Sequence, residues 1–195
     1  MQNQTTVLTW LMPRWTFVVW IISLVVVSPS DSLAVNQLIW NFPSWVPLPM
    51  IPENNRMSEA KVELGRRLFY EKKLSINKTM SCGTCHQKEK AFTDGKRIAV
   101  GATGESHVLN TPTLVNVAYS PILTWADPNS RRLEDHPLKP LFSIDPVEMG
   151  MGGQRKKIVE WLRSDAHYPL QFRAAFPKSK IKVSIKNITK ALAAF

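Results

Sequence analysis

The chain has 195 residues and a formal net charge of +10 at pH 7, a length that suits one domain with its own core plus a targeting segment. Its 14 prolines and 8 glycines predict a domain rich in loops and poor in long helices. The basic residues are scattered and lack interleaved aromatics, which excludes a typical nucleic-acid-binding surface and favours a solvated basic face suited to an acidic protein partner.

The N-terminal segment has the order of a secretory signal. Arg14 precedes an apolar run from Trp15 to Val27, and small residues follow at 32–34. We therefore predict a signal peptide over residues 1–34, cleaved after Ala34, and a periplasmic mature protein. The alternative is an uncleaved membrane anchor, although the run is shorter than the roughly 20 residues that a spanning helix needs.

Residues 35–57 are predicted to form an extended arm that packs its tryptophans, Trp40 and Trp45, on the surface of the following domain. Prolines recur in this segment at 43, 47, 49 and 52, and proline favours extended backbone. The arm leads into a domain predicted to span residues 58–195.

Four segments of that domain have helical spacing of apolar residues. Ser58 is suited to cap a helix that runs to about Tyr70, in which Gly65 permits the close approach of another element. The other three segments are 154–163, 170–176 and 184–195. Residues 91–128 show no sustained period and are predicted to be loops around a core that another group supplies.

The residues that carry chemistry are concentrated in CGTCH at 82–86. Two cysteines at this spacing cannot form a disulfide framework, and an exported protein would normally oxidise or occupy such a pair. The spacing allows Cys82 and Cys85 to form thioether bonds to one porphyrin and places His86 under the iron as its proximal ligand. A single motif of this kind predicts one covalent haem c.

Zinc sites and thioredoxin-like proteins also contain CxxC pairs. A zinc site would need a second cluster of ligands, yet His107, His136 and His167 are isolated in the sequence. A redox dithiol normally begins a helix after a strand, a context that this loop-rich chain lacks. Covalent haem is therefore the favoured interpretation.

Further motifs follow one another between about Met57 and the end of the chain. They are LGRRLFYEKKLS at 64–75, SCGTCH at 81–86, AFTDG at 91–95, NTPTLVNVAYS at 110–120, LTWADP at 123–128, LEDHPLKPLF at 133–142, PVEMG at 146–150 and ALAAF at 191–195. In this order they resemble the bacterial di-haem cytochrome c peroxidases and MauG-like enzymes, and within them the MbnH-like subgroup.

The resemblance implies an all-α, loop-rich, cytochrome-c-like haem domain in which hydrogen peroxide reacts. In that family a second haem domain of similar size follows and supplies electrons. This sequence stops at Phe195, where the second domain would be expected, so it resembles the N-terminal haem domain only. A separate second haem domain, or a dimer that covers the end after Phe195, is therefore expected as an alternative to a truncated protein.

The resemblance also assigns roles to residues near the haem. Glu148 matches the family's distal carboxylate, which would shuttle a proton between the two oxygens of peroxide. Trp125 matches the tryptophan that relays an electron between the two haems, with simple packing as the alternative. His136 stands where many relatives carry glutamine, and we expect it to assist proton transfer or to lie exposed rather than to ligate iron.

Three residues have weaker signals. Asn110 matches a residue that helps to bind calcium at the domain boundary, where the remaining ligands would come from the second domain. His107 is expected to be a solvated loop histidine, with a labile distal ligand as the alternative. His167 is expected to be structural.

Peroxide reduction with electrons from a redox partner protein, whether a small cytochrome, a cupredoxin or a protein substrate, is the function that the resemblance implies. The main alternative is a mono-haem electron carrier in which Met149 or Met151 closes the sixth position of the iron. A haem-binding fragment without turnover is the third.

Overall fold

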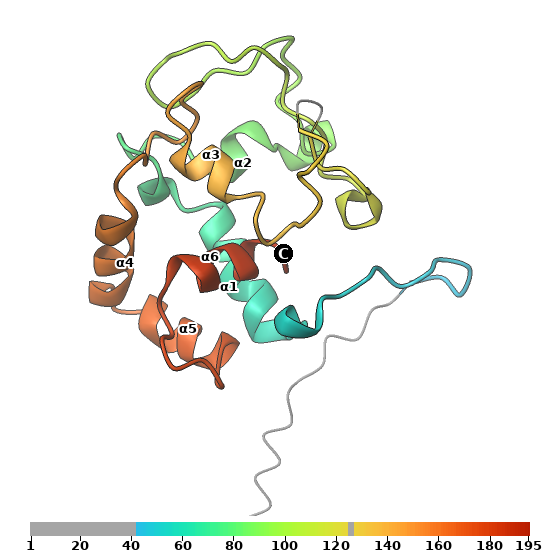
Figure 1. Ribbon diagram of the computed structural model, residues 1–195, viewed down its shortest axis with the longest axis vertical. Coiled ribbons are helices and arrows are strands. Elements are labelled where there is room, and N and C mark those ends of the chain that lie inside the picture. Colours follow the sequence, from blue (N-terminus) through green and yellow to red (C-terminus); the bar gives the residue numbers. More distant parts are fainter. Residues whose placement is uncertain (1–41, 125–126) are drawn as a thin grey trace, which may run out of the picture. The chain divides into compact units, whose positions relative to one another are not determined.

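Short helices joined by long loops make up residues 42–124 and 127–195, the part of the chain that the computed structural model describes (Figure 1). This part contains two isolated β-bridges and no β-strand, so the all-α, loop-rich class is confirmed. None of its helices has the length and apolar character needed to cross a bilayer. The predicted signal peptide, residues 1–34, lies outside the described residues, and so do Trp40 and Trp125.

The four predicted helices are present within a few residues of their expected bounds. They are α1 (Glu59–Phe69), α4 (Arg155–Ser164), α5 (Tyr168–Ala175) and α6 (Ile185–Leu192). Two shorter helices, α2 (Cys82–Cys85) and α3 (Leu138–Phe142), lie in the long segment between them. Single 3-10 turns occur at Glu53–Asn55, Lys72–Leu74, Lys88–Lys90 and Val117–Tyr119.

Helices α1, α4, α5 and α6 form what we call the helical scaffold. Helix α1 packs against α5 and α6, and α4 packs against α5. Leu64, Leu68 and Phe172 are completely buried in the shared core. A Cβ atom on Gly65 would lie only 2.0 Å from the carbonyl oxygen of Ala191, so the predicted close approach at this glycine is confirmed.

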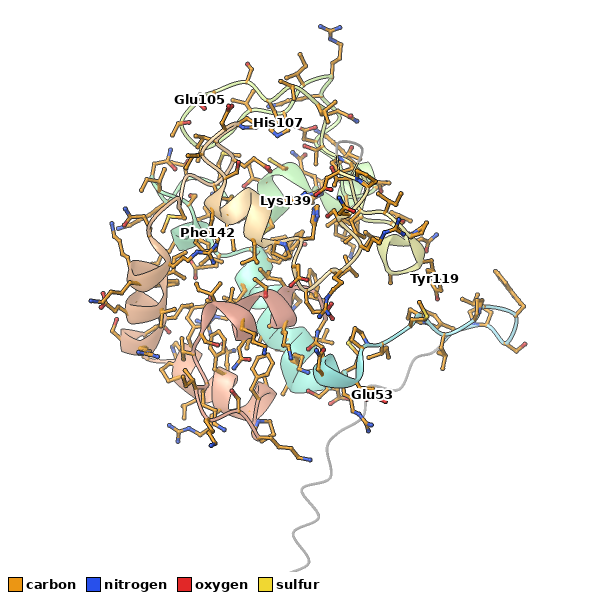
Figure 2. The ribbon with its side chains drawn as sticks, viewed as in Figure 1. Glu53, Glu105, His107, Tyr119, Lys139 and Phe142 are labelled. Carbon is orange, nitrogen blue, oxygen red and sulfur yellow. The ribbon has the colours of Figure 1, made fainter. Side chains whose placement is uncertain are left out.

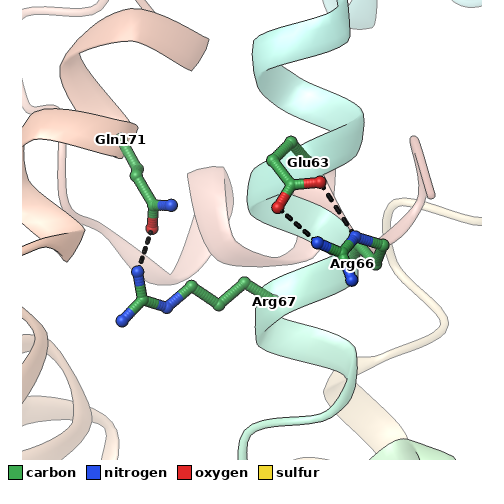
Figure 3. Close-up of polar contacts among 4 residues, drawn as sticks. All are labelled: Glu63, Arg66, Arg67 and Gln171. Carbon is green, nitrogen blue, oxygen red and sulfur yellow. Dashed lines mark hydrogen bonds and ion pairs between the residues drawn. The ribbon is translucent and has the colours of Figure 1, made fainter.

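Polar side chains of α1 form contacts within the helix and with α5 (Figure 3). Arg67 donates a hydrogen bond from Nη1 to Oε1 of Gln171 at 3.2 Å and so joins α1 to α5. Arg66 forms two hydrogen bonds with Glu63, at 2.8 and 2.6 Å, within the same helix. The Arg66 pair is exposed, and exposed pairs of this spacing contribute little to stability.

Serine caps explain where two scaffold helices begin. The Ser58 hydroxyl accepts a hydrogen bond from the Lys61 backbone N–H at the start of α1. The Ser184 hydroxyl does the same for the Asn187 N–H at the start of α6. Each cap satisfies a helix-end N–H group that has no partner within the helix.

The described part of the arm, residues 42–57, does not pack as predicted. Trp45 is 81% exposed, so the prediction that this tryptophan packs on the domain is wrong. The Tyr119 hydroxyl donates to the Pro47 carbonyl at 2.7 Å, which ties the arm to the domain through its backbone. A turn closed by the Val46 N–H and the Pro43 carbonyl at 2.9 Å precedes Pro47, so the arm is not extended throughout.

Residues 71–153, which we call the loop region, carry α2 and α3. In Figure 1 the chain between these helices arches over them as a long irregular loop. The loop is held by backbone hydrogen bonds, including Ala102 N–H to the Glu148 carbonyl at 2.6 Å and His107 N–H to the Ala99 carbonyl at 2.8 Å. The predicted loop character is thus confirmed for the described residues 91–124 and 127–128, and one turn of 3-10 helix lies within them.

Candidate functional site

A cavity of about 940 Å³ lies between α2, α3 and the loop that arches over them. This volume is near the upper end of the roughly 300–1,000 Å³ that is usual for ligand pockets. The predicted site residues in its lining come from four segments of the chain, and they are Cys82, Cys85, His86, Asn110, His136 and Glu148. His107 and Met149 line the same cavity, whereas Met151 and His167 do not.

Helix α2 presents the two thiols. Ser81 begins this helix, its N–H donating to the Thr84 hydroxyl at 2.9 Å. Both cysteines are free thiols. Burial raises the pKa of Cys82 to about 12 and also raises the pKa of Cys85. Redox dithiols depend on a lowered thiol pKa, so this environment disfavours a thioredoxin-like role.

The imidazole of His86 is oriented by the AFTDG motif. Its Nδ1 lies 2.9 Å from the carbonyl oxygen of Phe92, so Nδ1–H donates and Nε2 is left to accept a metal bond. Burial lowers the pKa of His86, which favours the neutral ring that ligates metals.

Strained backbone places the Phe92 carbonyl. Ala91 and Phe92 both have left-handed backbone conformations, with φ of 53° and 59°. Residues other than glycine rarely adopt this conformation. The Phe92 N–H donates to the Gln87 carbonyl at 2.8 Å, and the Thr113 hydroxyl donates to the Ala91 carbonyl. These bonds hold the tight turn that aims the carbonyl at His86.

Glu148 and His107 face each other in the cavity. His107 Nε2 lies 3.7 Å from Glu148 Oε1. The Leu109 N–H donates to His107 Nδ1 at 3.1 Å, so in the neutral ring the proton sits on Nε2, toward the carboxylate. Burial raises the pKa of Glu148, although the neighbouring His107 opposes that shift. At 3.7 Å the two atoms are beyond direct hydrogen-bond distance, so a proton would pass between them through a bridging water or a small side-chain shift.

The position of His107 corrects one prediction. The side chain of His107 is only 22% exposed, so the expectation of a solvated loop histidine is wrong. Figure 2 shows His107 on the loop beside Glu105, with Lys139 and Phe142 on α3. The only signal in the sequence was its place three residues before Asn110.

His136 lies just before α3 and is half-buried in the cavity lining. Its Nδ1 is 3.3 Å from the Ser130 hydroxyl. Burial lowers the pKa of His136, and the neighbouring Lys139 and His86 lower it further. The ring is therefore kept neutral, which suits proton transfer.

Asn110 is exposed at the edge of the cavity. Within the described ranges, no group of three or more His, Cys, Asp or Glu side chains is arranged to hold a metal ion. Calcium binding at Asn110 therefore has no support from neighbouring side chains of these types and remains a prediction.

The residues present fit a covalently attached haem. Two thiols come from α2 and one imidazole from the residue that follows it, and the Nδ1 bond to Phe92 leaves Nε2 as the nitrogen that would bind iron. The other walls are largely apolar, as a porphyrin requires. They include Phe69, Leu109, Pro112, Leu133, Leu141, Leu192 and Phe195.

Known proteins resemble the chain in both sequence and structure. The family model described as di-haem cytochrome c peroxidase matches residues 59–195. Methylamine utilization protein MauG of Methylophilus methylotrophus is 29% identical over 153 residues, which are 78% of this chain and 43% of that protein. Cytochrome c peroxidase Ccp of Escherichia coli K12 is 30% identical over 149 residues, 76% of this chain and 30% of that protein.

The same resemblance extends to a solved structure. The crystal structure of a MauG-like protein associated with microbial copper homeostasis superposes with a TM-score of 0.77 and 43% sequence identity. The match covers 81% of this chain and 45% of that one. The chain thus spans less than half the length of each of these three relatives.

Proposed function

The chain belongs to the di-haem cytochrome c peroxidase family, and from that premise we propose that it is a c-type haem protein that reduces hydrogen peroxide with electrons from an external donor. The family membership confirms the resemblance predicted by the ordered motifs. The observation that carries the proposal is the Glu148–His107 pair in the cavity that also contains Cys82, Cys85 and His86.

Cys82 and Cys85 would hold one haem c covalently, with His86 as the proximal ligand. The bound haem supplies an iron site at which peroxide is reduced. Cleavage of the bond between the peroxide oxygens needs a proton to move from one oxygen to the other. In this proposal Glu148 takes and returns that proton, which its position in the cavity lining beside His107 supports.

The test is the variant Glu148→Gln, which keeps the shape of the side chain and removes its acid–base function. We expect peroxide consumption to fall by about 10²- to 10⁴-fold, the usual contribution of a general acid–base group, while mass spectrometry shows full haem attachment. The matched control is Glu105→Gln, an exposed residue of the loop that carries His107, which does not line the cavity. An unchanged rate in Glu148→Gln would remove the assigned role.

One observation favours the mono-haem electron carrier as a second candidate. Met149 and Met151 are both buried in the core, but only Met149 also lines the cavity, so its thioether is the one placed to supply a sixth ligand. Methionine ligation raises the reduction potential. If the protein is a carrier, Met149→Leu will convert a low-spin absorption spectrum to a high-spin one; if it reduces peroxide, the wild type will already be high-spin.

Export and electron supply complete the proposal. The apolar N-terminal run supports a signal peptide and a periplasmic location. The basic net charge suits an acidic donor such as a small cytochrome or cupredoxin. A separate second haem domain or a protein substrate would be an alternative partner. Calcium at Asn110 would require ligands from such a partner.

A further inference from the structure

A column of aromatic rings joins the proximal histidine to the protein surface. The ring of Phe69 lies 6.3 Å from the ring of His86 and 5.1 Å from the ring of Tyr70, between centroids. Phe69 is buried and lines the cavity, whereas Tyr70 is 47% exposed. Phe195 packs on both, at 5.2 Å from Phe69 and 6.3 Å from Tyr70. Only one ring therefore separates Tyr70 from His86.

Tyr70 is also packed directly on the haem-attachment helix. A Cβ atom on Gly83, which lies between the two cysteines, would be 2.5 Å from Cδ1 and Cε1 of the Tyr70 ring. Any other residue at this position would push the ring away. The Tyr70 backbone N–H ends α1 by bonding the carbonyls of Arg66 and Leu68, so the helical scaffold fixes the base of the side chain.

Tyr168 and Tyr119, the other two tyrosines, do not combine exposure to solvent with contact to α2. Tyr168 is completely buried in the scaffold core, and its hydroxyl donates a hydrogen bond to the Glu71 carboxylate. Tyr119 is exposed, but its hydroxyl donates a hydrogen bond to the Pro47 carbonyl of the arm. The Tyr70 hydroxyl has no hydrogen-bond partner in the described part of the chain, so water is free to take its proton. Tyr70 alone combines exposure with contact to the haem-attachment helix.

We propose that Tyr70 is a redox-active residue through which single electrons from an external donor reach the haem. The inference rests on the proposed peroxide reduction. Each peroxide takes up two electrons and two protons to give two waters. Tyr70 gives one electron toward the haem by way of Phe69 and releases its phenolic proton to water, becoming a neutral tyrosyl radical. A one-electron donor at the surface then returns the electron and water returns the proton, and the cycle runs twice.

Electron paramagnetic resonance of the holoprotein tests the radical. Samples with tyrosine deuterated on the ring are frozen rapidly after one equivalent of hydrogen peroxide is added without donor. We expect a tyrosyl signal in wild type and in Tyr119→Phe, and its loss in Tyr70→Phe, which keeps the packing on Gly83. Mass spectrometry should find oxidation products on Tyr70. The inference is overturned if the tyrosyl signal persists in Tyr70→Phe. It is also overturned if wild type consumes peroxide but gives no tyrosyl signal. Both results leave the proposed function intact.

A second measurement needs no peroxide. Flash-quench oxidation with a photoexcited ruthenium complex removes one electron from the protein surface, and the ferrous haem replaces it by becoming ferric. We expect haem oxidation to slow about tenfold in Tyr70→Phe, a change of about 1.4 kcal/mol in barrier, and to be unaltered in Tyr119→Phe. Equal rates in all three proteins overturn the inference. Absence of peroxide consumption together with the tenfold effect would reject the proposed function alone.

Discussion

The helical scaffold and the loop region are held together in different ways. The scaffold buries its large side chains against one another, with Leu64, Leu68 and Phe172 fully excluded from solvent. The loop region instead turns many of its apolar residues toward the cavity, and several others, such as Val115 and Ile144, are exposed. The scaffold therefore carries its own core, whereas the order of the loop region depends on what fills the cavity.

The two regions meet at the cavity wall. Phe69 of α1, Leu192 of α6 and Phe195 line the cavity from the scaffold side. The scaffold thus presents a preformed apolar face, and the loops complete the enclosure. We expect haem attachment to stabilise the loop region much more than the scaffold.

Removing the attachment gives the largest expected effect. In the double variant Cys82→Ala/Cys85→Ala, matured with the same haem machinery, mass spectrometry should show complete loss of covalent haem. Hydrogen exchange should then lose protection across residues 91–153, because the loops no longer have a core to pack on, while α1, α5 and α6 keep theirs. Retained hydrogen-exchange protection of residues 91–153 in the haem-free protein would show that the loop region does not need the haem for its order.

Removing one buried ring from the scaffold core gives the next-largest expected effect, a loss of stability. Phe172→Ala removes a fully buried ring of α5 and should lower the free energy of unfolding by about 3–5 kcal/mol, because of lost burial and the cavity left behind. Denaturant unfolding followed by circular dichroism measures the change. The control is Leu170→Ala on the same helix, an exposed position where about 0.5 kcal/mol or less is expected. Comparable losses in both variants would show that the scaffold core does not carry the stability.

The smallest expected effect is a pH dependence at Lys61, on α1. Lys61 is 6% exposed, and burial lowers its pKa from 10.5 to about 8, with the positive charge of Lys190 adding to the shift. Between these pH values the unfolded chain binds more protons than the folded protein, so the free energy of unfolding contributed by this group rises with pH. The charged ammonium opposes folding fully only below about pH 8.

Lys61→Met should therefore be relatively most stable near pH 7, and its advantage over wild type should shrink toward pH 10.5. Thermal unfolding of both proteins at matched pH values measures this difference. Lys157→Met, which changes an exposed lysine of α4, should leave the wild-type pH dependence unaltered. The haem absorption spectrum should stay constant over the same window, because Lys61 does not line the cavity. A parallel shift of the spectrum would show that the two regions titrate together.

Local patterns in the sequence determined the scaffold and the attachment motif. Ser58 and Ser184 cap α1 and α6 as serine does in general, and the spacing of apolar residues predicted all four scaffold helices, because capping and helical periodicity act over a few neighbouring residues. CGTCH at 82–86 predicted the haem ligands for the same reason. The short helix α3, which contains Pro140, had no such signal.

Only the tertiary structure decided how His107 and Glu148 come together in the cavity lining. His107 and Glu148 come from distant parts of the chain, and backbone hydrogen bonds such as Ala102 to Glu148 bring them within 3.7 Å. The Phe92 carbonyl reaches His86 because Ala91 and Phe92 have left-handed backbone conformations. The spacing of apolar residues in the sequence does not predict such conformations. Trp45 is exposed for a similar reason: whether an apolar side chain finds a groove depends on the surface that other segments build. Contacts between distant segments leave no local pattern, so the fold alone sets them.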